Sequence, residues 1–191
     1  MNIGLVVEGL DDYQTYPSLI RRIRHDIEHI YVRSCGGIRR LRNKFVYFLK
    51  EFQSNPAHLI VKAIVVRDSD CNDAHTLERE LEQILELSGF RPEFPVHFHA
   101  TKCKLESLLL ADEDAISHVA QNRGKVVHVG PSHIALENSR DADTVLSRKL
   151  GEADLPADSK VFSEIAAASD LAKIVSRCPH FRDFSEKILA C

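Results

Sequence analysis

Residues 59–70 read L-I-V-K-A-I-V-V-R-D-S-D, an almost unbroken apolar run that ends in two aspartates. A strand that is buried on both faces, as in a parallel sheet, has this composition, because neither face alternates with solvent-exposed positions. We therefore expect residues 59–66 to form a central strand of a parallel sheet. Asp68 and Asp70 then lie just beyond its carboxyl end.

Strands and helices are predicted to alternate on either side of this run. The predicted strands outside it are residues 2–7, 29–33 and 94–98, and the predicted helices before residue 105 are 12–27, 38–52 and 74–88. Helices dominate from residue 105 onward, apart from a possible short strand at 125–129. This order favours an α/β fold with a mainly parallel sheet of about four strands and right-handed crossovers.

The length of the chain suits a single domain over residues 1–191. We expect residues 1–112 to form an α/β core and residues 113–191 to form a mainly helical extension. Pro156 and Pro179 punctuate that extension.

Bulk composition bounds the class of protein. The formal net charge of −3 does not indicate a nucleic-acid binder, although a local basic face can coexist with an acidic site. No leader-like segment and no apolar run of about 20 residues is present, so we expect no membrane association. The five cysteines are widely spaced with no C-x-x-C pair, which argues against a zinc site or a disulfide framework and favours a reducing cytoplasm.

Acidic side chains follow three of the predicted strands. Glu8 ends the first strand, Asp68 and Asp70 follow the third, and Glu106 follows the fourth and opens the next helix. Ligands of open parallel sheets bind beyond the carboxyl ends of the strands, so these acids are expected to converge. Two carboxylates about 4 Å apart repel by roughly 4 kcal/mol at an effective dielectric near 20. A hard cation removes that repulsion, and oxygen ligands on a D-x-D spacing favour Mg²⁺ or Mn²⁺, whereas the alternative for each acid alone is helix capping.

The segments Val6-Val7-Glu8-Gly9 and Asp68-Ser69-Asp70 resemble the first and second motifs of the Toprim domain. The chain is also similar to a small bacterial Toprim-like family, the domain of unknown function 4276. That similarity includes L-E-S-L-L-L-A-D at 105–112 and R-C-P-H-F-R-D-F at 177–184. The resemblance implies a Rossmannoid three-layer fold.

The resemblance also implies a magnesium-dependent nuclease or related phosphotransfer enzyme acting on DNA or RNA, in a phage-defence or mobile-element context. Glu8 would be a metal ligand or general acid/base, Asp68 and Asp70 would hold the ion, and Glu106 would complete a second metal position. Two ions about 4 Å apart would stabilise the attacking and leaving oxygens.

Glycines and basic residues supply the expected substrate contacts, because a glycine-bearing turn that opens a helix presents N–H groups to phosphate. These residues are Gly9, Gly36, Gly37, Arg39, Arg40 and Lys104.

Weaker signals were set aside. Asp68-x-Asp70-x-Asn72 begins like an EF-hand loop but lacks the glycine and the final glutamate that such loops require. His97 and His99 share one face of a strand, where an exposed or hydrogen-bonded face is a simpler interpretation than a metal pair. His75 lies near the acidic loop and could contact substrate, and Asp112 could simply cap the following helix.

Two other functions stay open. One is a catalytically inactive Toprim-like module that binds metal, nucleic acid or an operon-encoded protein partner. The other is a phospho-acceptor receiver domain, for which Asp11 and Asp12 come too late in the chain. The sequence leaves the oligomeric state open.

Overall fold

The structure is a computed structural model that describes residues 1–132 and 134–190. Its four strands are β1 (Asn2–Val7), β2 (His29–Ser34), β3 (Ile60–Asp68) and β4 (Val96–Thr101). The helices of the first half are α1 (Leu10–Ile23), α2 (Ile38–Ser54) and α3 (Ala74–Leu87). The second half contains α4 (Leu105–Leu109), α5 (Glu113–Asn122), a 3-10 turn η1 (Leu136–Asn138), α6 (Ala142–Glu152), α7 (Ser159–Ala168), α8 (Leu171–Arg177) and α9 (Phe181–Leu189).

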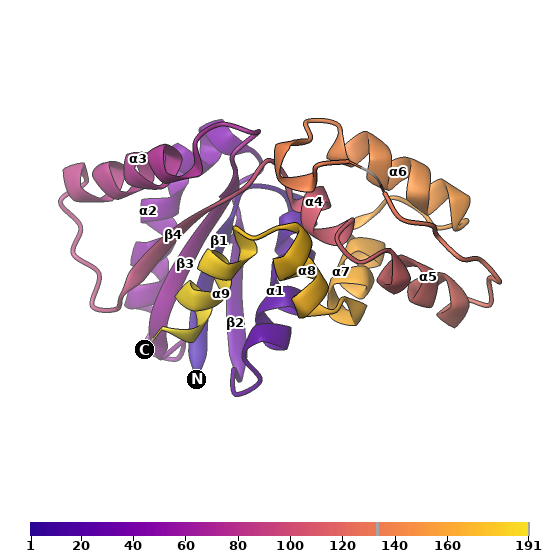
Figure 1. Cartoon of the computed structure of the whole chain (residues 1–191). Coiled ribbons are helices and arrows are strands. Elements are labelled where there is room, and N and C mark those ends of the chain that lie inside the picture. The colour runs from indigo at the N-terminus through magenta and orange to yellow at the C-terminus, as the bar shows by residue number, and fades with distance from the viewer. Residues whose placement is uncertain (133, 191) are drawn as a thin grey trace.

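All three strand pairings in the sheet are parallel, and the strand order is β2-β1-β3-β4. The carboxyl ends of the strands therefore meet at one edge, the upper edge in Figure 1. At that edge Val7 pairs with Val66 of β3, and Asp68 pairs with Thr101 of β4. The predicted α/β class, with four parallel strands and a helical C-terminal extension, is confirmed.

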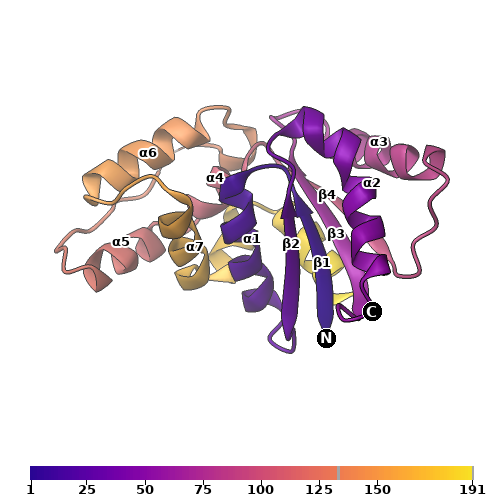
Figure 2. The same ribbon diagram turned by 180° about the vertical axis from the view of Figure 1, so that it is seen from behind.

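Two apolar layers lie against opposite faces of the sheet, because successive strand residues point to opposite sides. Ile3, Leu5 and Val7 of β1 join the layer formed by α1 and the C-terminal helices. Val6 joins the layer that contains residues of α2 and α3. Figures 1 and 2 show α9 on one face of the sheet and α2 on the other, which gives a three-layer α/β arrangement.

Three local predictions differ from the structure. Helix α1 covers Leu10–Ile23, so it begins two residues before the start of the predicted range of 12–27 and ends four residues before the end of that range. Strand β4 begins at Val96 and runs on to Thr101, because Pro95 lacks an N–H and only its carbonyl joins the ladder, by accepting from Ala63.

The third difference concerns residues 125–129, which form no strand in the part of the chain that the structure describes. The N–H of Val129 instead donates to the side chain of Ser117, so this segment is held by a helix and not by the sheet. None of the described helices is long and apolar enough to cross a bilayer.

The C-terminal helices are joined to the sheet by packing and by one buried cation. Phe184 of α9 is fully buried, with its ring 5.4 Å from Tyr16 of α1 and 4.9 Å from His99 of β4. Lys62 interrupts the apolar run of β3, and its ammonium donates to the backbone carbonyls of Lys187, Ile188 and Ala190 at the end of α9. The lysine in the strand is therefore the partner of a helix C-terminus.

A disulfide joins Cys71 to Cys103, which corrects the expectation that the cysteines are unpaired. The two residues follow β3 and β4 and are separated by 32 positions in sequence, yet the parallel pairing of these strands brings their Cα atoms to 4.0 Å. Sequence spacing alone carries no sign of such a pair. The disulfide connects the loop that bears Asp70 to the segment that leads to Glu106.

Candidate metal centre at the carboxyl edge of the sheet

Five carboxylates gather where β1, β3 and β4 end. They belong to Glu8, Asp12, Asp68, Asp70 and Glu106. Their positions follow from the topology, since the strands that precede them are neighbours in the sheet. Glu8, Asp68, Asp70 and Glu106 are the metal ligands expected from the sequence, and Asp12 is a further acid beside them.

Asp68 is the residue on which this cluster is centred. Burial raises the pKa of Asp68 well above its ordinary value, and the charges of Asp12, Glu106, Glu8 and Asp70 raise it further. Its carboxylate also accepts a hydrogen bond of 3.1 Å from the N–H of Leu105, at the start of α4. A carboxylate that is repelled by four neighbouring negative charges is a strong candidate ligand for a cation.

Asp12 lies in the first turn of α1 and faces the same edge. Its carboxylate accepts a 2.7 Å hydrogen bond from the N–H of Gly9. Burial raises its pKa to about 7, and the charges of Glu8 and Glu106 contribute. Asp12 is not among the metal ligands expected from the sequence. Its position four residues after Glu8 was the available signal, because a helix that starts at Leu10 places its first turn beside the strand end.

Glu8 sits between the N-terminus of α2 and the end of β3. Burial raises its pKa, while the guanidinium of Arg67 and the backbone N–H groups of Asp68 and Ile38 oppose that rise. Arg67 is 7% exposed and also pairs with Glu80 at 3.5 Å. The site therefore contains a buried cation next to Glu8 that the sequence analysis did not identify.

Glu106 opens α4 from the other side of the cluster. Its side chain is partly buried. Burial raises its pKa, while its own backbone N–H and the charge of Lys104 oppose that effect. Lys104 itself forms an ion pair of 2.8 Å with Asp143 of α6. The ammonium expected to contact substrate is therefore engaged with the helical extension.

The glycine turn before α2 lies beside Glu8. Gly36 and Gly37 have φ values of +74° and +118°, a backbone conformation that favours glycine. The N–H of Gly37 donates to the backbone carbonyl of Glu8 at 2.8 Å. Arg39 and Arg40 in the first turn of α2 are exposed, so this turn presents basic side chains near the acidic cluster.

Other acidic and polar residues in this region have structural partners. Asp112 accepts from the N–H of Asp170 and pairs with Lys173, both at 2.8 Å. Asp73 caps α3 by accepting from the N–H of Thr76. The hydroxyl of Ser69 is buried and accepts from the N–H of Cys103, so it holds β3 to β4.

The donor chemistry of the cluster suits a hard divalent cation, although among the described residues no three of these carboxylates have oxygens that all lie within 4.8 Å of one another. Every candidate ligand is a carboxylate oxygen, and Mg²⁺ and Mn²⁺ prefer oxygen ligands. Burial and mutual repulsion raise the pKa of Asp12, Asp68 and Glu106, so the ionised forms are costly without a compensating charge.

The fold and this edge define a class: a three-layer α/β protein with an acidic cluster at the carboxyl ends of its parallel strands. The chain belongs to the family described as "Domain of unknown function (DUF4276)", whose profile matches residues 7–189. Among solved structures, the C-terminal region of the Burkholderia pseudomallei OLD protein is similar at 18% identity and a TM-score of 0.46. That match covers 96% of this chain and 98% of the other. No curated protein matches the chain significantly.

Proposed function

We propose that this protein is a Mg²⁺- or Mn²⁺-dependent nuclease, or a related phosphotransfer enzyme, that acts on the phosphodiester bonds of DNA or RNA. The observation that supports it is the set of four carboxylates that raise the pKa of Asp68. A divalent ion bound there would polarise a phosphate oxygen and lower the pKa of water.

The residues of the cluster would have two kinds of role, metal binding and proton transfer. Asp68, Asp70 and Asp12 would hold the cation, and Glu106 would hold a second one from the side of α4. Glu8 stands beside the guanidinium of Arg67 and carries a raised pKa. It is therefore suited either to bind the cation or to exchange a proton with the attacking or leaving oxygen.

Substrate binding is assigned to the basic first turn of α2. Gly9, Gly36 and Gly37 supply backbone at the site, and Arg39 and Arg40 supply exposed positive charge beside it. An anionic polymer would be drawn to these arginines while its phosphate meets the cation, so the net charge of −3 does not oppose this substrate. Lys104 is less suited to this role, because Asp143 already engages its ammonium.

The test is a cleavage assay with the full chain on fluorescent single-stranded DNA, duplex DNA, supercoiled plasmid and RNA, with Mg²⁺ or Mn²⁺. We expect cleavage that chelator abolishes. Asp68→Asn should lower the rate at least about 100-fold, because it removes the central ligand while keeping the shape of the side chain.

Asp73→Asn is the matched control, since Asp73 is a fully exposed acid of the same loop and asparagine also caps helices well. It should cleave at the wild-type rate. Equal cleavage by wild type and Asp68→Asn would overturn the nuclease proposal. Calorimetric Mg²⁺ binding without cleavage of any substrate would favour the inactive binding module.

A further inference from the structure

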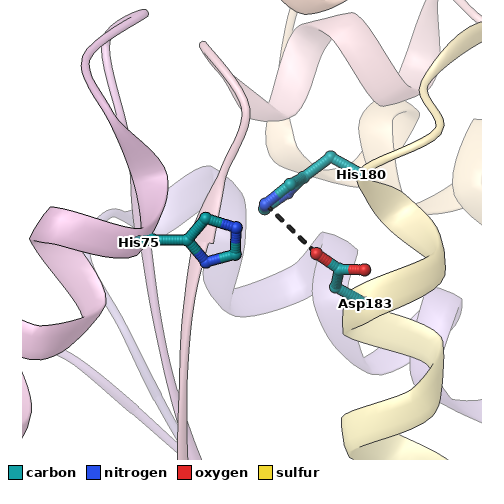
Figure 3. A group of neighbouring side chains, drawn as sticks. All are labelled: His75, His180 and Asp183. Atoms are coloured by element: carbon teal, nitrogen blue, oxygen red, sulfur yellow. Dashed lines mark ion pairs between the residues drawn. The ribbon is translucent and has the colours of Figure 1, made fainter.

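A second group of metal-ligating side chains lies away from the acidic cluster, where α3 and α9 begin. His75 belongs to α3, and His180 and Asp183 belong to the start of α9. One donor atom from each residue lies within 4.8 Å of the other two. Figure 3 shows the ring of His75 reaching from α3 toward the two side chains of α9.

The spacing of the pair on α9 matches the coordination sphere of a tetrahedral ion. Nε2 of His180 and Oδ2 of Asp183 are 3.4 Å apart. With Zn–N and Zn–O bonds of about 2.1 Å, a tetrahedral site places two donors about 3.4 Å apart. Residues three apart on a helix lie on one face, so the backbone of α9 holds this pair in place.

Apart from the contact with Asp183, the ring nitrogens of His180 have no hydrogen-bond partner among the described residues. Both Nδ1 and Nε2 are also shielded from solvent. A buried polar atom without a partner costs free energy and calls for an explanation such as an ion. His75 is the opposite case: its side chain is 64% exposed, so it can rotate toward an ion without disturbing the core.

The surroundings orient His180 and compensate the local charges. The ring of His99 stacks on the ring of His180, with 5.3 Å between the ring centroids. The backbone N–H of His180 donates to the carboxylate of Glu137 at 2.6 Å. Lys187 lies near His75 and Asp183, and its ammonium forms an ion pair of 2.7 Å with the carboxylate of Glu78. This pair neutralises the positive charge of Lys187.

A cavity of about 400 Å³ opens beside the cluster. His75, His97 and Asp183 line it, together with the acidic side chain of Glu186. Solvent or an ion can therefore reach His75 and Asp183 from this side.

We propose that His75, His180 and Asp183 form a binding site for a borderline transition-metal ion, Zn²⁺ being the first choice, with a water in the remaining position. Two imidazoles and one carboxylate are a donor set that zinc accepts and magnesium does not prefer. The bound ion would link the first turn of α3, five residues after Asp70, to the helix that covers the sheet. The site is independent of the proposed nuclease activity.

The test is a titration of the full chain, without a polyhistidine tag and after removal of metal by chelator, against a chromophoric Zn²⁺ competitor. We expect one Zn²⁺ per chain. His75→Gln should weaken binding at least about tenfold, as loss of even an outer partner does. Zn²⁺ should also raise the melting temperature of the wild type by about 5 °C at 100-fold excess over the dissociation constant, and that of His75→Gln by much less.

Co²⁺ supplies a readout of geometry. Tetrahedral Co²⁺ bound to the wild type should give visible absorption bands that both His75→Gln and Asp183→Ala lose. His118→Gln is the matched control, since His118 is an exposed histidine on α5 whose ring pairs with Asn122. It should bind Zn²⁺ like the wild type.

Asp68→Asn separates this site from the acidic cluster and should keep full Zn²⁺ affinity while losing cleavage. Three results would each overturn the proposal: no Zn²⁺ binding by the wild type at micromolar free metal, equal affinity in wild type and His75→Gln, or loss of Zn²⁺ affinity in Asp68→Asn.

Discussion

The pKa of Asp12 is set by burial against the end of the sheet and by Glu8 and Glu106 nearby. Its carboxyl titrates near 3.8 in an unfolded chain and near 7 in the folded protein. Between those pH values the unfolded chain releases the proton while the folded protein keeps it. The contribution of Asp12 to the free energy of unfolding therefore falls as pH rises from about 4 to 7, and this lost contribution is not regained above pH 7.

Asp12→Asn should stabilise the metal-free protein at pH 8 and flatten this pH dependence. Asparagine keeps an oxygen for the N–H of Gly9 but carries no charge, so we expect a gain of about 2–4 kcal/mol. Urea unfolding between pH 4.5 and 8, with and without Mg²⁺, measures it. Mg²⁺ should stabilise the wild type above pH 7 and the variant much less.

Asp11→Asn is the control for that experiment. Asp11 is the exposed neighbour of Asp12 in the same helical turn, and it accepts a hydrogen bond from Ser159. Its substitution should leave the slope of stability against pH nearly unchanged. A metal-free Asp12→Asn protein that is no more stable than the wild type at pH 8 would contradict this prediction. It would show that burial and the charges of Glu8 and Glu106 do not destabilise the ionised carboxylate of Asp12.

The strands and helices were predictable where one-dimensional patterns decide them. The run at 59–66 identified β3, and parallel topology then followed from the alternation of strands and helices. Asp12 and the Cys71–Cys103 pair were not predicted, because both depend on which side chains the ends of separate elements bring together. The group of His75, His180 and Asp183 was not predicted for the same reason, because more than 100 residues separate His75 from the other two.

At the scale of the loops, the disulfide joins the ends of β3 and β4. Reduction should lower stability by about 4 kcal/mol, since the bond closes a loop of 32 residues in the unfolded chain. It should also lower the affinity for Mg²⁺, because Asp70 precedes Cys71 and adopts a φ of +48° that the closed loop helps to hold. Thermal melts and Mg²⁺ calorimetry, with and without dithiothreitol, measure the two effects.

Cys71→Ser provides the control, since its melting temperature should match that of the reduced wild type and should not respond to dithiothreitol. Cys35 and Cys178 are buried thiols whose pKa burial raises to about 11 and about 12, so they should stay unreactive. A wild-type melting temperature that is insensitive to reductant would contradict the assignment of the Cys71–Cys103 disulfide.

At the scale of the molecule, one apolar cluster contains residues from β1, α1 and the helices after residue 105. Two residues of α1 strengthen the connection: Arg22 donates to the backbone carbonyl of Ser169 at 3.0 Å, and the hydroxyl of Ser18 pairs with that of Ser163 in α7 at 2.8 Å. We infer that residues 1–191 unfold as a single unit and not as a core with a detachable extension.

Phe184→Ala tests that inference. The side chain is fully buried between α1 and β4, so its truncation should cost about 3–5 kcal/mol of the whole protein's stability. Circular dichroism and tyrosine fluorescence should report one coincident urea transition in wild type and variant. Leu189→Ala, at a residue of the same helix that is 53% exposed, should change stability by less than about 1 kcal/mol. Two separate transitions would show that the helices form their own domain.

The strand order has a consequence for how the chain reaches this structure. Asn2 pairs with His29, Ile3 with Lys62 and Ala63 with Val96, so every ladder of the sheet joins positions more than 25 residues apart. No hairpin can nucleate it, and each pairing requires closure of a long loop before any ladder hydrogen bond compensates for the lost chain entropy. We therefore expect assembly of the sheet to be the slow event of folding, and the carboxylates meet only when β1, β3 and β4 have paired.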